Sequence, residues 1–270
     1  MIKLVLSDVD GTLIPLGHGT VTQRTLAAIK AVQDAGVRFG LATGRDVPEL
    51  LGQFRGQAWP FATGILSNGK KIMVDGELAR LTLLSNESLS RLAELAREYP
   101  QTFVNVYPLE VEPADLVYCI GATEEEIAPW KGTFGFNGVA IPKVPDTQII
   151  GATIACNRDQ QTLDEFLKRA REVCPCFDYA QPAPQWCDVL PKGLNKGTAL
   201  PMLLDALGLS HDEAMMFGDA DNDVAILLSV EHSVVVAGAT PAASAAARWH
   251  IGPAEDDSVA QALEQIAKEK

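Results

Sequence analysis

Two aspartates, Asp8 and Asp10, stand two residues apart in the stretch from Asp8 to Leu13. They follow residues 2–7, a run rich in Ile, Val and Leu and without Gly or Pro, which is typical of a buried strand. Side chains at this spacing point the same way from an extended backbone, and Gly11 then allows the chain to turn. Paired carboxylates at a strand end could bind a cation or transfer protons. Taken alone, the stretch fits a solvated acidic turn equally well.

Three further polar groups lie where a strand is expected to end or a helix to begin. They are Thr43, Lys196 and the acidic run from Asp219 to Asp223. In an open parallel sheet the carboxyl ends of the strands share one edge, and ligands bind there. We therefore expect these groups to converge on Asp8 and Asp10, although they lie far apart in the sequence.

These residue types predict phosphoryl chemistry. Carboxylates from the first and last groups make a hard-oxygen site suited to Mg²⁺, which keeps several waters and a substrate phosphate as ligands. Lys196 and the Thr43 hydroxyl can bind the remaining phosphate oxygens. A carboxylate can also attack phosphorus and form an acyl phosphate, which divides hydrolysis into two steps. Asp10 can donate a proton in one step and accept it in the other. Gly11 and Thr12 are expected mainly to shape the turn.

The order of the predicted elements indicates an α/β fold. Strands and helices alternate up to about residue 82 and again after residue 191, which predicts a Rossmann-like, doubly wound parallel sheet. Between them, two helices stand among several strands and predict an inserted α+β domain. We therefore expect a core made of residues 1–82 and 190–270, and an insert of residues 83–189.

The predicted elements have definite ends. Strands are expected over 2–7, 37–42, 65–69, 102–107, 116–120, 148–155, 177–180, 186–190, 214–217 and 233–236. Helices are expected over 22–36, 48–54, 85–99, 159–173, 195–207, 224–228 and 242–248, with a last helix capped by Asp257 or Ser258.

Composition excludes several other functions. The 270 residues are 47% hydrophobic and carry a formal net charge of −13. This charge argues against a protein that binds the phosphate backbone of nucleic acids. No apolar run reaches the length of a membrane span and no signal-peptide pattern is seen, so we expect no membrane partner and a cytoplasmic location. The odd number of cysteines, 5, favours free thiols. The choice between monomer and homodimer stays open.

Other catalytic and metal-binding patterns are incomplete. The acidic run imitates the start of an EF-hand loop, but Val224 and Val230 stand where Gly and Glu are needed. Residues 193–198 have the wrong spacing for a Walker A loop. The four histidines are scattered, and no serine-nucleophile elbow is present.

Together, the polar groups resemble the four motifs of the haloacid dehalogenase superfamily. The matching residues are Asp8-Val9-Asp10-Gly11-Thr12-Leu13, Thr43-Gly44-Arg45, Lys196 and Gly218-Asp219-x-x-Asn222-Asp223. The insert between the second and third motifs resembles that of the Cof-type phosphatases of class IIB, which carry an α+β cap of the C2B type. Residues 67–69 and 190–197 also fit this subfamily.

The resemblance implies a role for each matching position. Asp8 would be the nucleophile and a Mg²⁺ ligand, and Asp10 the general acid and base, with its backbone carbonyl also on the metal. Lys196 would balance charge. Thr43, Gly44 and Asn222 would bind phosphate. Asp219 would complete the metal site with Asp223, and which of Asn222 and Asp223 contacts the metal directly stays open. For Arg45, contact with substrate and a salt bridge on the core surface are both open.

The expected activity is therefore that of a Mg²⁺-dependent phosphatase. Its substrate would be a small phosphorylated metabolite, such as a sugar phosphate or related phosphomonoester, and the insert would close over the core as a cap that contributes specificity. Two alternatives stay open, namely a phosphomutase of the same superfamily and a non-catalytic sensor that binds a phosphometabolite.

Overall fold

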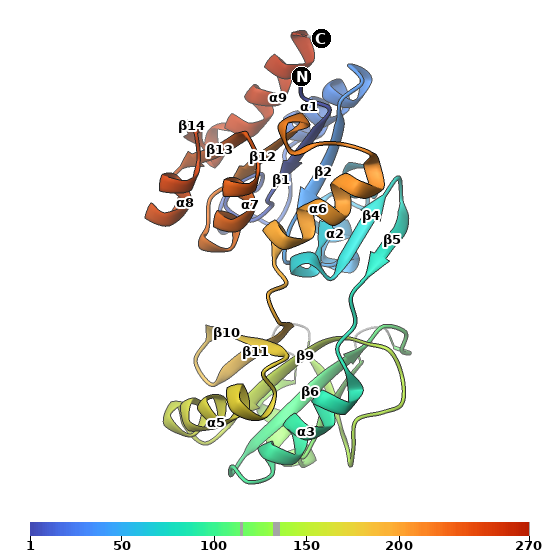
Figure 1. The fold of residues 1–270 in the computed structure, drawn as a ribbon, viewed down its shortest axis with the longest axis vertical. Coiled ribbons are helices and arrows are strands. Elements are labelled where there is room, and N and C mark those ends of the chain that lie inside the picture. The colour runs from blue at the N-terminus through green and yellow to red at the C-terminus, as the bar shows by residue number, and fades with distance from the viewer. Residues whose placement is uncertain (114–115, 132–135, 270) are drawn as a thin grey trace. The chain divides into compact units, whose positions relative to one another are not determined.

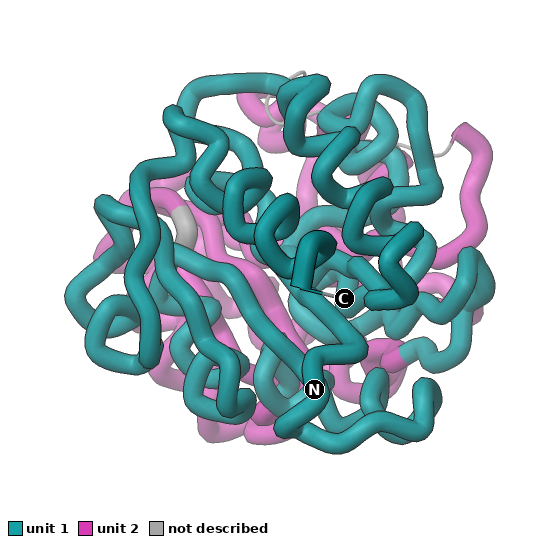
Figure 2. Tube along the Cα trace, turned by 90° about the horizontal axis from the view of Figure 1, so that it is seen from above, with its two compact units in different colours: residues 1–81, 194–270 teal, residues 82–193 magenta. Residues whose placement is uncertain are grey.

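In a computed structural model, residues 1–113, 116–131 and 136–269 are described. The chain divides into two units, the first made of Met1–Leu81 with Leu194–Lys270 and the second of Thr82–Gly193 (Figures 1 and 2). The first core segment thus ends at residue 81 where the sequence suggested 82, and the second begins at residue 194 where it suggested 190.

The first unit contains an eight-stranded sheet in the order β14-β13-β12-β1-β2-β3-β4-β5. All neighbours from β14 to β3 pair in parallel, whereas β4 and β5 are antiparallel. The α/β prediction is confirmed, but the β4–β5 hairpin and β14 were not predicted. The strands are β1 Leu4–Ser7, β2 Arg38–Ala42, β3 Gly64–Leu66, β4 Lys71–Val74, β5 Glu77–Leu81, β12 Ala214–Gly218, β13 His232–Ala237 and β14 Trp249–Pro253.

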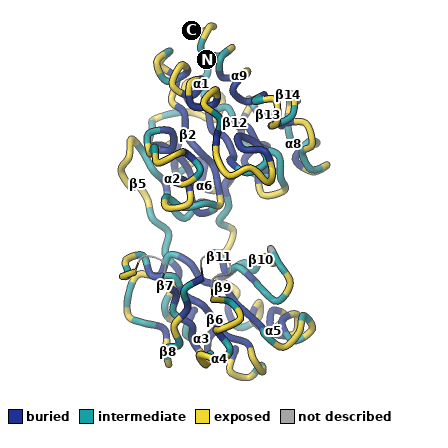
Figure 3. Tube along the Cα trace, turned by 180° about the vertical axis from the view of Figure 1, so that it is seen from behind, coloured by how far each residue is buried: buried dark blue, intermediate teal, exposed yellow. Residues whose placement is uncertain are grey.

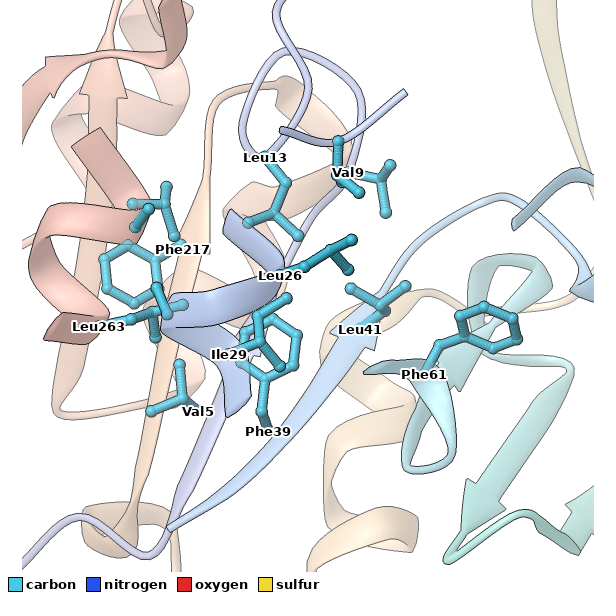
Figure 4. Packing of buried hydrophobic residues seen from close by; sticks show 14 of the residues in the cluster. Val5, Val9, Leu13, Leu26, Ile29, Phe39, Leu41, Phe61, Phe217 and Leu263 are labelled. Carbon is cyan, nitrogen blue, oxygen red and sulfur yellow. The ribbon is translucent and has the colours of Figure 1, made fainter. Parts of the chain in front are cut away.

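Helices cover both faces of this sheet, as a doubly wound fold requires. One cluster of buried residues joins the sheet to α1, α2 and α9, and Figure 4 shows Leu263 of α9 beside Phe217 of β12 and Ile29 of α1 beside Phe39 of β2. A second cluster joins the sheet to α6, α7 and α8. These helices are α1 Gln23–Asp34, α2 Val47–Gln53, α6 Lys196–Leu207, α7 Val224–Ser229, α8 Pro241–Ala246 and α9 Ser258–Lys268.

The second unit is α+β. Its six-stranded sheet has the order β10-β11-β9-β6-β7-β8, and α3 and α5 share one buried cluster with it. The dark strands of Figure 3 show that the interior of each unit lies along its sheet. The elements are α3 Asn86–Ala96, β6 Thr102–Pro108, β7 Leu116–Ile120, α4 Glu124–Ile127, β8 Asn137–Ile141, β9 Ile149–Cys156, α5 Gln160–Val173, β10 Phe177–Ala183 and β11 Trp186–Pro191.

Helix caps explain several of the predicted boundaries. Thr22 caps α1 by accepting a hydrogen bond from the Thr25 N–H, and Asn195 caps α6 in the same way through residues 197 and 198. The predicted side-chain cap of α9 by Asp257 was wrong. Asp257 precedes that helix in a left-handed conformation without a side-chain cap bond, and its carboxylate instead accepts the Thr22 hydroxyl at 2.9 Å.

Two expectations from composition can be compared with the described residues. All five cysteines are free thiols, and only Cys176 among them is exposed. Across the part of the chain that the structure describes, no helix has both the length and the apolar character needed to cross a bilayer.

Candidate active site

The register of the sheet places three of the predicted groups at one edge. Ser7, the last residue of β1, pairs with Leu41 of β2 and with Phe217 of β12. The next residue, Asp8, donates its backbone N–H to the Phe217 carbonyl at 2.8 Å. Thr43 and Asp219 directly follow the ends of β2 and β12, so they leave the sheet on the same side as Asp8.

Lys196 links the first acidic group to the last. It is the first residue of α6 and is only 1% exposed, and its Nζ lies 2.8 Å from Asp8 Oδ1 and 2.7 Å from Asp223 Oδ1. The next residue, Gly197, lets α6 approach α7 closely, because a Cβ there would lie 2.6 Å from the Ala225 backbone. A large buried lysine is thereby held between two carboxylates.

Asp223 organises the loop after β12. It is fully buried, and its Oδ2 accepts the backbone N–H groups of Asp219 and Ala220, each at 3.1 Å. Its Oδ1 is bound to Lys196. A Cβ on Gly218 would lie 2.8 Å from this carboxylate, so only glycine fits at the end of β12. Asp223 therefore fixes the backbone from which the Asp219 side chain projects.

Asp219 is held from the first loop. Its Oδ1 accepts the Thr12 hydroxyl at 2.6 Å. Gly11 has a φ of +85°, and a Cβ at that position would collide with the Asp219 carboxylate. Gly11 and Thr12 thus do more than shape the turn, because they make room for this carboxylate and bind it. This contact was not predicted from the sequence.

The charges of this cluster do not balance. Carboxylate oxygens of Asp8, Asp219 and Asp223 lie within 4.8 Å of one another, and Lys196 is the cation bound between two of these residues. Burial raises the pKa of Asp8 to about 7, although Lys196 opposes this effect, and burial likewise raises the pKa of Asp219. Burial alone would lower the pKa of Lys196, but Asp8 and Asp223 outweigh it and raise that pKa.

This donor set fits a divalent cation. One lysine among three close carboxylates leaves an excess of negative charge in a largely buried place, which is unfavourable unless a cation or protons neutralise it. The ligand atoms are all carboxylate oxygens, which suit hard cations such as Mg²⁺. Asp219 and Asp8 have the oxygens that are least committed to protein donors, whereas both oxygens of Asp223 are engaged.

The Asp10 side chain is held separately from the acidic cluster. Arg45 Nε lies 2.8 Å from Asp10 Oδ2 and Arg45 Nη2 lies 3.1 Å from Oδ1. Gln53 Nε2 also donates to Oδ1, at 3.0 Å. Of the two readings left open for Arg45, the structure shows the salt bridge, and the hydrogen bond to Asp10 raises the pKa of the guanidinium. Gln53 was not foreseen.

The residues expected to bind phosphate lie at the ends of two elements. Thr43 is buried, and its hydroxyl oxygen accepts the Arg45 N–H at 3.2 Å. Gly44 is exposed, and a Cβ on it would lie 3.1 Å from the Asn68 side chain, so Asn68 borders the same place. Asn222 is exposed in the 3₁₀ turn Asp221–Asp223. The roles of these residues stay predictions.

Comparison with known proteins identifies the family. A model of the haloacid dehalogenase-like hydrolase family matches residues 5–263. The chain belongs to this family. The resemblance inferred from the four motifs is thereby confirmed, and so is the expectation of a hydrolase.

Named relatives of this hydrolase are phosphatases. An HMP-PP phosphatase of Enterobacter sp. (strain 638) is 27% identical over 265 residues, covering 89% of this chain and 86% of that protein. Among solved structures, a protein from Eubacterium rectale superposes with a TM-score of 0.83 at 22% identity, over 98% of both chains. A HAD subclass IIB sugar phosphatase superposes with a TM-score of 0.73 at 20% identity, over 97% of this chain and 98% of that chain. These structures support the fold.

Proposed function

We propose that the protein is a Mg²⁺-dependent phosphatase that hydrolyses a small phosphorylated metabolite through an aspartyl-phosphate intermediate. A sugar phosphate or related phosphomonoester is the expected substrate class. The observation that carries this proposal is the cluster of three carboxylates at the carboxyl edge of the sheet, two of which are buried and bound to Lys196. Relatives that match this chain over most of their length are named phosphatases, which supports the proposal.

The metal would be held by Asp8 and Asp219, with Asp223 beside them and the backbone carbonyl of Asp10 as a further ligand. When bound, Mg²⁺ would neutralise the carboxylates and the phosphate so that the two anions can approach each other. Thr12 and Gly11 keep the Asp219 carboxylate in place for this task, through the 2.6 Å hydrogen bond and the space beside it.

Asp8 would act as the nucleophile. One of its carboxylate oxygens attacks phosphorus, forms the P–O bond of an acyl phosphate and displaces the alcohol oxygen of the substrate. Lys196 compensates the charge of Asp8 and of the transferred group, since it is already bound to that carboxylate at 2.8 Å. Thr43, Gly44 and Asn222 would bind the other phosphate oxygens and orient the group in line with Asp8.

Asp10 would move the protons. In the first step it donates a proton to the leaving oxygen as the P–O bond to the alcohol breaks. In the second step it takes a proton from water, whose oxygen attacks phosphorus while the bond to Asp8 breaks and phosphate leaves. After both steps Asp8 and Asp10 have returned to their starting states.

The second unit would serve as the cap that selects the substrate. Its separate α+β core gives it a sheet of its own, independent of the catalytic cluster. The free thiols are typical of a reducing compartment, which supports a cytoplasmic location for this activity.

The test is a panel of phosphorylated metabolites assayed for phosphate release with Mg²⁺ and with a chelator. The proposal predicts release that requires a divalent cation and is lost in Asp8→Asn. An isomeric phosphoester in place of free phosphate would indicate a phosphomutase. Binding without turnover would indicate a sensor, and either result would contradict the proposal.

A further inference from the structure

Three hydrogen bonds from two residues fix the carboxylate of Asp10. Arg45 donates one to each oxygen, and Gln53 adds a second bond to Oδ1 at 3.0 Å. The Asp10 side chain is 38% exposed, so the remainder of the carboxylate is open to solvent or substrate. The two oxygens of this carboxylate are therefore in different environments.

The position of Gln53 is itself fixed by the loop that follows the first aspartates. Its backbone carbonyl accepts the Val21 N–H at 3.0 Å, and Arg55 Nε donates to the Val21 carbonyl at 3.1 Å. Val21 is fully buried. The last turn of α2 and the loop before α1 thus hold Gln53 next to Asp10.

The carboxamide of Gln53 shows why a glutamine stands here. Its Nε2 binds Asp10, whereas its Oε1 is buried and has no hydrogen-bond partner in the described structure. A buried carbonyl without a partner is unfavourable, so packing alone would favour an apolar side chain of the same length. The benefit of the carboxamide is the N–H that it donates to Asp10.

The count of lone pairs distinguishes the two oxygens of Asp10. A carboxylate oxygen offers about two acceptor sites. Oδ1 uses both, for Arg45 and Gln53, while Oδ2 uses one, for Arg45. Arg45 alone would occupy one acceptor site on each oxygen, and the Gln53 N–H adds the third point at which the carboxylate is held.

We propose that Gln53 is a positioning residue that holds the Asp10 carboxylate in the orientation from which Asp10 exchanges protons during the reaction. This inference rests on the proposed function, in which Asp10 is the acid and base. In the first step the proton on Asp10 passes to the leaving oxygen as the P–O bond of the substrate breaks, and the orientation of the carboxylate decides how well it reaches that oxygen. In the second step a proton of the attacking water passes to the Asp10 carboxylate as the bond to Asp8 breaks.

The experiment compares Gln53→Met with the wild-type full chain on 4-nitrophenyl phosphate and phenyl phosphate. The two substrates have nearly the same shape but differ in leaving group. Nitrophenolate leaves without help from a proton donor, whereas phenolate depends on one. Methionine keeps the length of the side chain and removes the N–H. Glu49→Gln is the control, since Glu49 binds Arg45 Nη1 at 2.9 Å and Gln can keep the capping contact of α2.

We expect Gln53→Met to fold as well as the wild type. It should lower kcat/KM for phenyl phosphate about tenfold more than kcat/KM for 4-nitrophenyl phosphate, because it loses a part of the rate factor that a general acid supplies. Glu49→Gln should keep the wild-type ratio. A ratio in Gln53→Met that equals the wild-type ratio, whether both rates fall together or neither falls, would overturn the inference. A wild-type protein that releases phosphate from neither ester and from no member of the metabolite panel would overturn the proposed function and this inference with it.

Discussion

Replacement of Lys196 by methionine tests the charge balance of the acidic cluster. The lysine is 1% exposed and is bound to both Asp8 and Asp223, at 2.8 and 2.7 Å. Methionine fills a similar volume without a charge. The variant therefore leaves two buried carboxylates without their cation while it changes the packing little.

Removal of one partner of a buried ion pair destabilises a protein by about 3–5 kcal/mol, because the other charge stays buried. We expect this loss for Lys196→Met in the presence of a chelator at about pH 8, where Asp8 is ionised in the folded state. Lys192→Met is the matched control. Its side chain is 65% exposed and paired with Asp178 on the surface, so a change below about 1 kcal/mol is expected.

The sign of the pH dependence follows from Asp8. Burial raises its pKa from 3.8 to about 7, so the folded protein binds this proton more tightly than the unfolded chain does. The contribution of Asp8 to stability is therefore present at low pH and is lost as the pH rises through the folded pKa. The destabilisation by Lys196→Met should shrink at about pH 5, since a protonated carboxyl no longer needs the lysine.

Urea unfolding of both lysine variants and the wild type, in chelator at both pH values, measures this effect. The reasoning would be refuted by a loss at high pH no larger than that of Lys192→Met. It would also be refuted by a loss for Lys196→Met that grows as the pH falls.

Three further predictions concern the carboxylate of Asp219 and the metal. Mg²⁺ at a hundredfold excess over its Kd should stabilise the wild type by about 2–3 kcal/mol in thermal unfolding. The gain should fall as the pH is lowered, because protons compete at Asp8 and Asp219, whose pKa values are both raised. An equal gain for Asp219→Asn would place the ion elsewhere. Gly11→Ala should weaken Mg²⁺ binding in calorimetry about tenfold, while Gly17→Ala, with nearly the same φ of +84° but open space around it, should not. Thr12→Val removes the 2.6 Å hydrogen bond from the Thr12 hydroxyl to the Asp219 carboxylate, which is charge-assisted. The variant should lower the free energy of unfolding in urea by about 1.5–3 kcal/mol, and an unchanged urea midpoint would contradict this value.

The central strands could be predicted from the sequence because both of their faces are buried. β1 and β2 read as short apolar runs for this reason, and their ends gave the positions of Asp8 and Thr43. The edge strands β5 and β14 lack this signal, since most of their residues are exposed or only half-buried. Their pairing depends on neighbours that local sequence does not reveal.

The candidate site divides in the same way. Asp8, Lys196 and Asp219 could be placed because each follows a recognisable strand or begins a recognisable helix. The contact of Thr12 with Asp219 spans 207 residues and that of Gln53 with Asp10 spans 43, so each requires the folded chain. The sequence held one signal for the Gln53 contact. Arg45, Glu49 and Gln53 are spaced four residues apart, and residues at this spacing are neighbours on a helix surface.

The most direct test of the account is to trap the phosphorylated enzyme. The protein is mixed with Mg²⁺ and a phosphomonoester that it hydrolyses, quenched in acid within the first turnover, digested and examined by mass spectrometry. The account predicts a phosphoryl group on the Asp8 side chain, which disappears when hydrolysis is complete. A phosphoryl group on another residue, or Mg²⁺-dependent phosphate release that continues in Asp8→Asn, would contradict it.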